Sequence, residues 1–165
     1  MCACVSHEKY PPDWAPIVKP SNDCLTISGT YNDDSSSKIL PLCYFLTSQV
    51  IKSCNLNNKT VYVQINKGDD DALIVIAWNE STRLAEKIYK KNEYTCTDGG
   101  IEISMGMDLT DGGVLGLEWH KLTLKKASDD SLVVMCRGGG FGLYGMLIPI
   151  VVIDDIQYYK YPQKK

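Results

Sequence analysis

The side chains best able to carry out chemistry in this chain are its two histidines and seven cysteines. Nucleophilic catalysis needs a cysteine or a serine beside a histidine. His7 lies in a proline-bearing stretch near the start, and His120 lies in an alternating segment between Trp119 and Lys121. Because a histidine on the polar face of a strand is usually only a surface residue, we predict no catalytic group. A hydrolase that uses His120, paired with Cys54 or Cys136, is the alternative.

Two cysteines in polar, turn-rich sequence are candidates for a disulfide. Cys24 follows Asn22-Asp23, and Cys96 lies inside the stretch from Tyr94 to Gly99. A disulfide between loops indicates an oxidising compartment. No two cysteines are separated by the two residues typical of a structural zinc site, so we predict no metal and no cofactor.

Two further cysteines stand at the start of the chain, in Met1-Cys2-Ala3-Cys4. A packed core has little use for cysteine at a frayed terminus, whereas a mature lipoprotein begins with a lipidated cysteine after its signal is removed. Prolines follow and disfavour a helix. We therefore expect a leader or tether over residues 1–22, with the lipid on Cys2 or alternatively on Cys4, and a single domain over residues 23–162.

The glycine-rich stretch from Gly138 to Gly145 is the most conspicuous motif. A phosphate-binding loop needs a strand before it and a helix after it, but Pro149 follows here and forbids a regular helix. We predict a hairpin or a bulge. Its apolar members are candidates for a lip over a ligand cavity: Phe141, Leu143, Tyr144 and Met146.

The elements that position these residues are mainly strands. One short helix is predicted near residues 38–50, with Ser37 as its N-cap. From residue 60 onward the apolar period changes to 2. Strands are predicted over residues 61–65, 72–78, 83–91, 101–104, 114–125, 131–136, 146–153 and 156–161. Residues 83–91 also match a helical face, and residues 24–31 suit a short entry strand or a bend.

Polar turns separate these predicted strands. The run Asp69-Asp70-Asp71 lacks the alternate spacing of a calcium loop and is predicted to be a turn, as is Asp154-Asp155. Short strands joined in this way indicate a mainly β fold, an antiparallel meander that closes into a small, lipocalin-like barrel or sandwich. Four glutamates lie in strand-like segments without distinguishing context: Glu86, Glu93, Glu102 and Glu118.

Composition excludes some classes of protein. The formal net charge of −3 argues against nucleic-acid binding, which needs a clustered basic face. The longest apolar runs fall well short of the roughly 20 residues of a membrane-spanning helix. Membrane attachment would therefore run through the N-terminal lipid.

Several motifs resemble those of a family of proteobacterial lipoproteins of unknown function. The segment Tyr10-Pro11-Pro12-Asp13-Trp14 and the stretch from Cys24 to Asn32, which reads C-L-T-I-S-G-T-Y-N, are similar to the start of that family. Residues 94–100 and 158–161 are similar to its tail. The resemblance implies a lipidated cysteine and a place on the periplasmic side of the outer membrane, and it implies no activity.

We therefore expect a lipid-anchored envelope lipoprotein that acts by binding rather than by catalysis. Its partner would be an apolar ligand held in the barrel, since small barrels have room for one small ligand, or another protein of the envelope. A purely structural assembly component is a further alternative.

Overall fold

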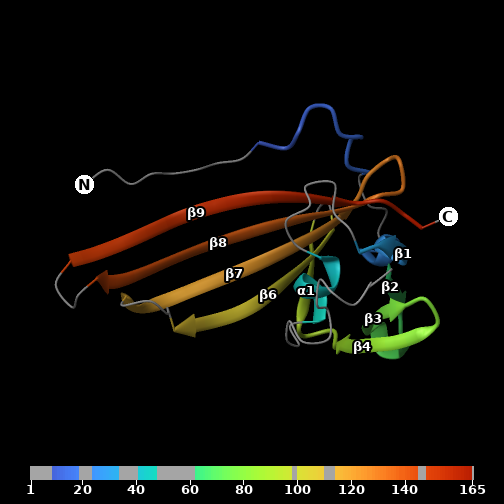
Figure 1. Ribbon diagram of the computed structural model, residues 1–165, viewed down its shortest axis with the longest axis horizontal. Coiled ribbons are helices and arrows are strands. Elements are labelled where there is room, and N and C mark those ends of the chain that lie inside the picture. Colours follow the sequence, from blue (N-terminus) through green and yellow to red (C-terminus); the bar gives the residue numbers. More distant parts are fainter. Residues whose placement is uncertain are drawn as a thin grey trace.

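The computed structural model describes residues 9–18, 24–33, 41–47, 62–97, 100–109, 114–144 and 148–164, and the fold is given for these residues alone. Within them the protein is mainly β, with two antiparallel sheets and one short α-helix (Figure 1). The predicted fold class is confirmed at that level.

The first sheet has the strand order β1-β2-β3-β4. Its strands are β1 (Gly29–Asn32), β2 (Tyr62–Lys67), β3 (Leu73–Asn79) and β4 (Thr82–Tyr89). Alternation buries Val63 and Ile65 of β2 against the core and leaves Gln64 half-buried on the other face. The predicted hairpin between β2 and β3 is confirmed, and its turn is a short 3-10 segment, η2 (Asp69–Asp71).

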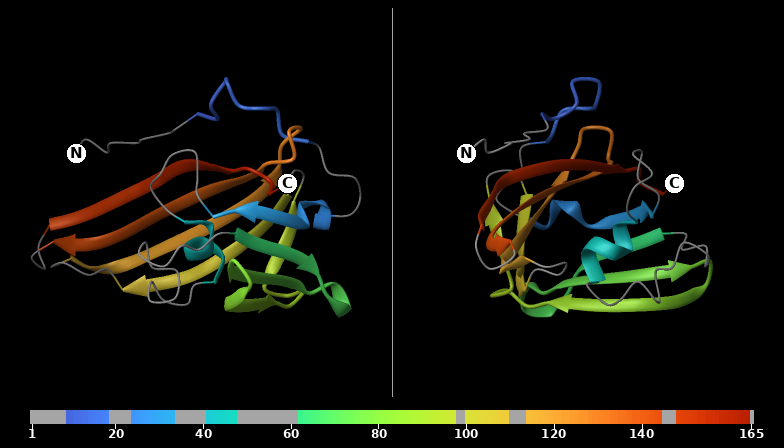
Figure 2. Two further views of the ribbon diagram at one scale, coloured as in Figure 1. Left: turned by 45° about the vertical axis from the view of Figure 1, so that its right-hand side comes forward. Right: turned by 60° about the vertical axis from the view of Figure 1, so that its left-hand side comes forward.

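The second sheet has the order β5-β6-β7-β8-β9. Its strands are β5 (Tyr94–Thr97), β6 (Gly100–Leu109), β7 (Val114–Lys126), β8 (Leu132–Tyr144) and β9 (Ile148–Tyr161). The last four run on past the first sheet as a long curved ribbon (Figures 1 and 2).

The two sheets are joined differently at their two sides. On one side the residues after β9 add to β1: Asn32 N–H donates to Pro162 O at 2.9 Å, and Lys164 N–H donates to Thr30 O at 2.8 Å. On the other side the chain passes from β4 to β5 through the turn at residues 90–93, and the described strands show no pairing between β4 and β5. A closed barrel is therefore not found among the described residues.

Helix α1 (Leu42–Thr47) lies between the sheets (Figure 1). Leu42 and Leu46 are fully buried, and the Phe45 ring lies 4.9 Å from the Tyr159 ring of β9. Tyr89 Oη of β4 donates to Leu46 O at 2.7 Å. The helix therefore contacts one sheet with each face and fills the space between them.

A residue far from the helix in sequence caps its N-terminus. Leu42 N–H donates to Asp33 O at 3.2 Å, and Cys43 N–H donates to Asp33 Oδ1 at 2.7 Å. The predicted helix near residues 38–50 is confirmed, although it begins only at Leu42. The predicted cap, Ser37, lies outside the described residues, and Asp33 satisfies the free N–H groups.

The end of the chain differs from the prediction. The two strands expected over 146–153 and 156–161 are one continuous strand, β9, so the turn predicted at Asp154-Asp155 is wrong. The neighbouring strand β8 supplies a hydrogen-bonding partner along this stretch, including Gly138 opposite Asp155, and this pairing overrides the local turn preference of aspartate. The glycine-rich stretch is the second half of β8, with the predicted bulge between Gly138 and Gly140.

Residues 9–18 of the predicted leader lie on the domain rather than away from it. Val18 N–H donates to Lys126 O, and Ser128 N–H donates to Pro16 O, both at 2.9 Å. The Trp14 ring meets the Tyr10 ring edge-on at 5.8 Å, and Lys160 Nζ lies 5.9 Å from the Trp14 ring centre. This segment is therefore a strap held at the β7–β8 turn and on β9.

Candidate functional site

The open side between β4 and β5 is where the structure offers a binding surface. β4 is the last strand of the first sheet, and β5 is short, so it covers β6 only from Gly100 to Ile103. Two sheet edges therefore face the same region. We call this region the seam.

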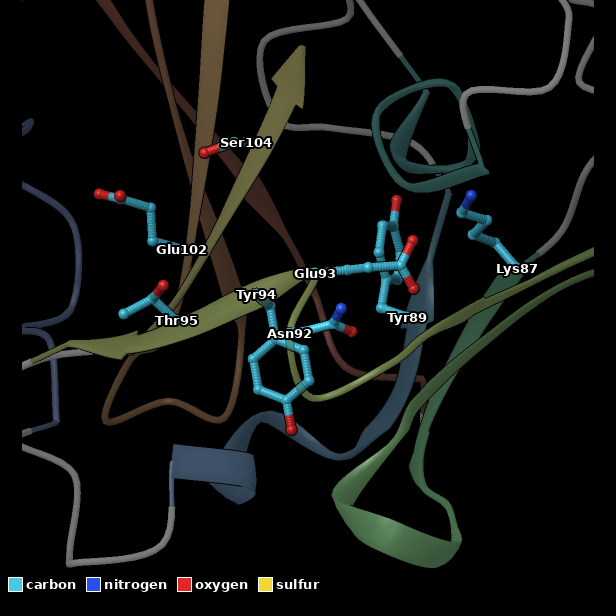
Figure 3. A pocket seen from close by; sticks show the side chains of 8 residues that line it. All are labelled: Lys87, Tyr89, Asn92, Glu93, Tyr94, Thr95, Glu102 and Ser104. Atoms are coloured by element: carbon cyan, nitrogen blue, oxygen red, sulfur yellow. The ribbon is translucent and has the colours of Figure 1, made fainter.

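A cleft of about 400 Å³ lies in the seam (Figure 3). Figure 3 shows Glu102, Thr95 and Ser104 along β5 and β6, and Lys87 and Glu93 near Tyr89 at the opposite side. The lining comes from β4, the following turn, β5 and β6: Lys87, Tyr89, Asn92, Glu93, Tyr94, Thr95, Glu102 and Ser104.

The two tyrosines of the cleft serve the fold. Tyr89 and Tyr94 are only 5% and 6% exposed. Tyr89 Oη donates to Leu46 O, and Tyr94 Oη donates to Asp71 O. Burial, with a smaller contribution from the nearby Glu93 charge, raises the pKa of Tyr89 to about 12. This phenol therefore stays protonated near pH 7.

Each carboxylate of the cleft accepts a hydrogen bond from a neighbouring residue and has acceptor positions to spare. Glu93 Oε2 accepts from Lys90 N–H at 2.7 Å, which closes the β4–β5 turn. Glu102 Oε1 accepts from Lys121 Nζ of β7 at 3.0 Å. A carboxylate offers about four acceptor positions, so each of these groups can receive further donors from a bound molecule.

A second cleft of about 490 Å³ shares Asn92 with the first. It lies at the other side of the β4–β5 turn and is lined by Asp69, Asp70, Ala72, Lys90, Lys91 and Asn92. Asp71 beside it accepts from Lys67 at 3.1 Å, and Lys91 Nζ lies 3.8 Å away. The hydrogen bond from Lys67, followed by the two lysine charges, lowers the pKa of Asp71.

His120, the residue of the alternative hydrolase prediction, is exposed on β7 and pairs in register with Gly138. Cys136 of β8 pairs in register with Leu122, so His120 and Cys136 occupy diagonal rather than directly opposite positions. Diagonal positions across an antiparallel pair are roughly 7–8 Å apart between Cα atoms. Cys54, the other predicted partner of His120, lies outside the described residues, and the hydrolase alternative stays a prediction.

The candidate lip residues lie away from the seam in the chain. Phe141, Leu143 and Tyr144 belong to β8, and Met146 lies outside the described residues. The two clefts above are lined by other residues. The prediction of a lip therefore stays a prediction.

The cysteines predicted for the disulfide both lie beside β6. Cys24 begins a 3-10 turn, η1 (Cys24–Ile27), that contacts β6 and β7, and Cys96 of β5 pairs with Ile101 of β6. The disulfide between them stays a prediction. Cys2 and Cys4 lie outside the described residues.

The described part of the chain contains no group of three or more histidine, cysteine or carboxylate side chains placed to hold a metal ion. No helix in the described ranges combines the length and the apolar character needed to cross a membrane. Comparisons of the chain with protein-family models, with curated proteins and with solved structures gave no match.

The residues of the cleft escaped the sequence prediction. The sequence identifies Glu93 and Glu102 only as glutamates in strand-like segments. Nothing in it predicts that the turn containing Glu93, after β4, lies next to Glu102 of β6. The available signal was the polar turn Lys90–Glu93 directly before an aromatic residue, Tyr94. It marks an exposed connection but gives no indication that the two sheets part there.

Proposed function

We propose that the protein is a lipid-anchored, periplasm-facing protein of the bacterial envelope that binds a partner protein at the seam. The observation that carries this proposal is the cleft of about 400 Å³ between β4 and β5–β6, open at two sheet edges and lined mainly by polar groups. Such a surface is suited to a polar partner that stays hydrated at its rim.

The interior supports a protein partner over an apolar ligand. Between the sheets, the described side chains form a single packed cluster that includes Tyr31, Leu46, Ile103 and Tyr161. Protein interiors of this kind are close-packed. Space for an apolar ligand would have to lie elsewhere, under the long ribbon of β6 to β9.

A barrel-like closure belongs to the same proposal. The bridge between Tyr31 of β1 and Gln163, after β9, links the two sheets on one side and supports a ring-like arrangement of the strands. The break in this ring is the seam. A lipocalin-like barrel opened along one side would place the binding site between strands instead of inside.

The lipid anchor is supported by the cysteines at positions 2 and 4 and by the resemblance described above. Metabolic labelling of the encoded protein with an alkyne-bearing palmitate, in a bacterial host that processes lipoproteins, tests it. We expect label on the wild-type protein in the membrane fraction and its loss in Cys2→Ala or Cys4→Ala. Unlabelled wild-type protein in the cytosol would exclude both the anchor and the location.

The partner is tested by photo-crosslinking in the envelope of the same host. A photoreactive phenylalanine analogue at Thr95, which is exposed in the cleft, should yield a defined crosslinked product. The matched control is the same analogue at Glu80, which is exposed in the β3–β4 turn. Equal products from both positions, or none from Thr95, would contradict binding at the seam.

A further inference from the structure

We propose that the seam takes an extended, basic polypeptide segment as an added strand along β4. This inference rests on the proposed function and specifies how the partner binds. In the described structure β4 pairs with β3 alone, and the pairing is regular from Ala85 opposite Ala77 to Tyr89 opposite Leu73. No other described strand pairs with its outer edge, so the N–H and C=O groups of that edge are a template for strand addition.

The facing edge of β6 is a poorer template. Beyond Ile103, where β5 ends, β6 continues from Ser104 to Leu109, and its register with β7 shifts between Ser104 and Met107. A bulge bends a strand and interrupts the regular spacing of its hydrogen-bonding groups. An incoming segment would therefore pair with β4, while Ser104 and Glu102 contact its side chains.

The aromatic residues of the cleft argue for a polypeptide over a glycan. Sugar rings are commonly bound by stacking on an open aromatic face, but the rings of Tyr89 and Tyr94 are buried. Lys87 Nζ lies 5.4 Å from the Tyr89 ring centre, and Lys91 Nζ lies 5.4 Å from that of Tyr94. The seam instead presents main-chain N–H and C=O groups of β4, which are complementary to those of a peptide backbone.

The charge of the site sets the chemistry of the segment. Glu93 and Glu102 approach the cleft from two sides and each retains acceptor capacity, against Lys87 as the one basic side chain of the lining. The whole chain carries a formal charge of −3, which favours encounter with a basic partner. The second cleft continues past Asn92, so the surface suits an extended segment more than a compact one.

The test is selection of random octapeptides displayed on phage against the full chain. We expect enriched peptides to carry Lys or Arg and to lack Pro at the paired positions, because proline removes the donor. A synthetic copy of the most enriched peptide should slow hydrogen exchange of alternate backbone amides within Ala85–Tyr89 by about tenfold or more. No enrichment, or unchanged exchange in β4, would overturn the proposal.

Matched variants test the charge. The double variant Glu93→Gln, Glu102→Gln should weaken binding of that peptide by about tenfold, whereas Glu80→Gln should leave it within about twofold. Gln retains an acceptor oxygen, so both variants are expected to fold, and their circular dichroism confirms this. Equal weakening in the control, or none in the double variant, contradicts the basic segment.

The outcomes separate the two proposals. If Thr95 captures an envelope protein but β4 exchange is unaffected, strand addition is wrong and binding at the seam stands. If tetra-N-acetylchitotetraose binds and displaces the peptide, the site is one for glycans, and the polypeptide assignment is overturned.

Discussion

Asp129 holds the lysine of β9 that lies against the strap. Its Oδ2 accepts from Lys160 Nζ at 2.6 Å, and its Oδ1 accepts from Ser131 Oγ at 2.6 Å. Lys160 in turn lies beside the Trp14 ring. Partial burial alone would raise the pKa of Asp129, but the hydrogen bonds from Lys160 and Ser131 outweigh it and hold the pKa at about 2.

This depressed pKa predicts release of the strap in acid. The contribution of Asp129 is fully present above its ordinary pKa of 3.8 and is lost as the pH falls through about 2. Because the carboxylate is partly exposed, we expect a contribution of only about 0.5 kcal/mol. Tryptophan fluorescence between pH 5 and about pH 1 measures it, with Trp14→Phe as the control that should remove the signal. An unchanged transition in Asp129→Asn would contradict this role.

Gly100 is required by a close approach of two strands. A methyl group added at Gly100 would overlap the main-chain oxygen of Leu124 on β7. We expect Gly100→Ala to lower the free energy of unfolding by about 2–4 kcal/mol, because the obstacle is backbone that cannot rotate away. At Gly29 the nearest atom is the Tyr31 hydroxyl at 3.2 Å, so Gly29→Ala is the milder control. Equal urea midpoints for the two variants would refute this explanation.

Helix α1 is too short to be stable by itself, since isolated helices of this length are marginal in water. Its stability comes from burial of Leu42 and Leu46 and from the remote cap at Asp33. The helix is therefore stable only as part of the packed core. Its position depends on β1, because the capping residue Asp33 directly follows that strand.

The cap gives a prediction about stability. Asp33→Ala removes the acceptor for Cys43 N–H and should lower the free energy of unfolding by about 1–2 kcal/mol. Asp33→Asn keeps an oxygen in that place and should lose less. Urea denaturation of the two variants measures the difference, and an Asn variant as unstable as the Ala variant would show that the charge matters more than the cap.

How far the sequence predicts these elements depends on how local their causes are. The β2–β3 hairpin was predicted because its alternation and its turn lie within one short stretch. The continuity of β9 through Asp154-Asp155 was not, since its cause is pairing with β8. The cap at Asp33 was missed for the same reason, because the intervening chain separates it from Leu42.

The proposed disulfide bears on the stability of the whole molecule. Cys24 precedes the first sheet and Cys96 belongs to the second, so a bond between them would link the entry of the domain to β5. We expect a Cys24–Cys96 peptide in a non-reducing digest of protein alkylated in its native state. Loss of this disulfide in Cys96→Ser should lower the free energy of unfolding by about 2–4 kcal/mol. Separate alkylation of both residues would exclude the pairing, and Cys136→Ser should leave the map unchanged.

The arrangement of the two sheets was predicted only in outline. Period-2 alternation and polar turns gave the mainly β class and most strands. They did not show that the meander divides between β4 and β5, because the residues around that turn read like those of any hairpin. The candidate site therefore became visible only when the two sheets were placed in space.

The bridge between Tyr31 and Gln163 also constrains the order of folding. The first strand of the first sheet receives its outer neighbour from residues that follow the last strand of the second sheet. During synthesis, β1 keeps one open edge until the residues after β9 have emerged. Such contacts between distant parts of a chain are slow to form, and an open edge attracts other chains meanwhile. Ribosome-bound intermediates that end before Gln163 should therefore bind holdase chaperones more strongly than those that include it.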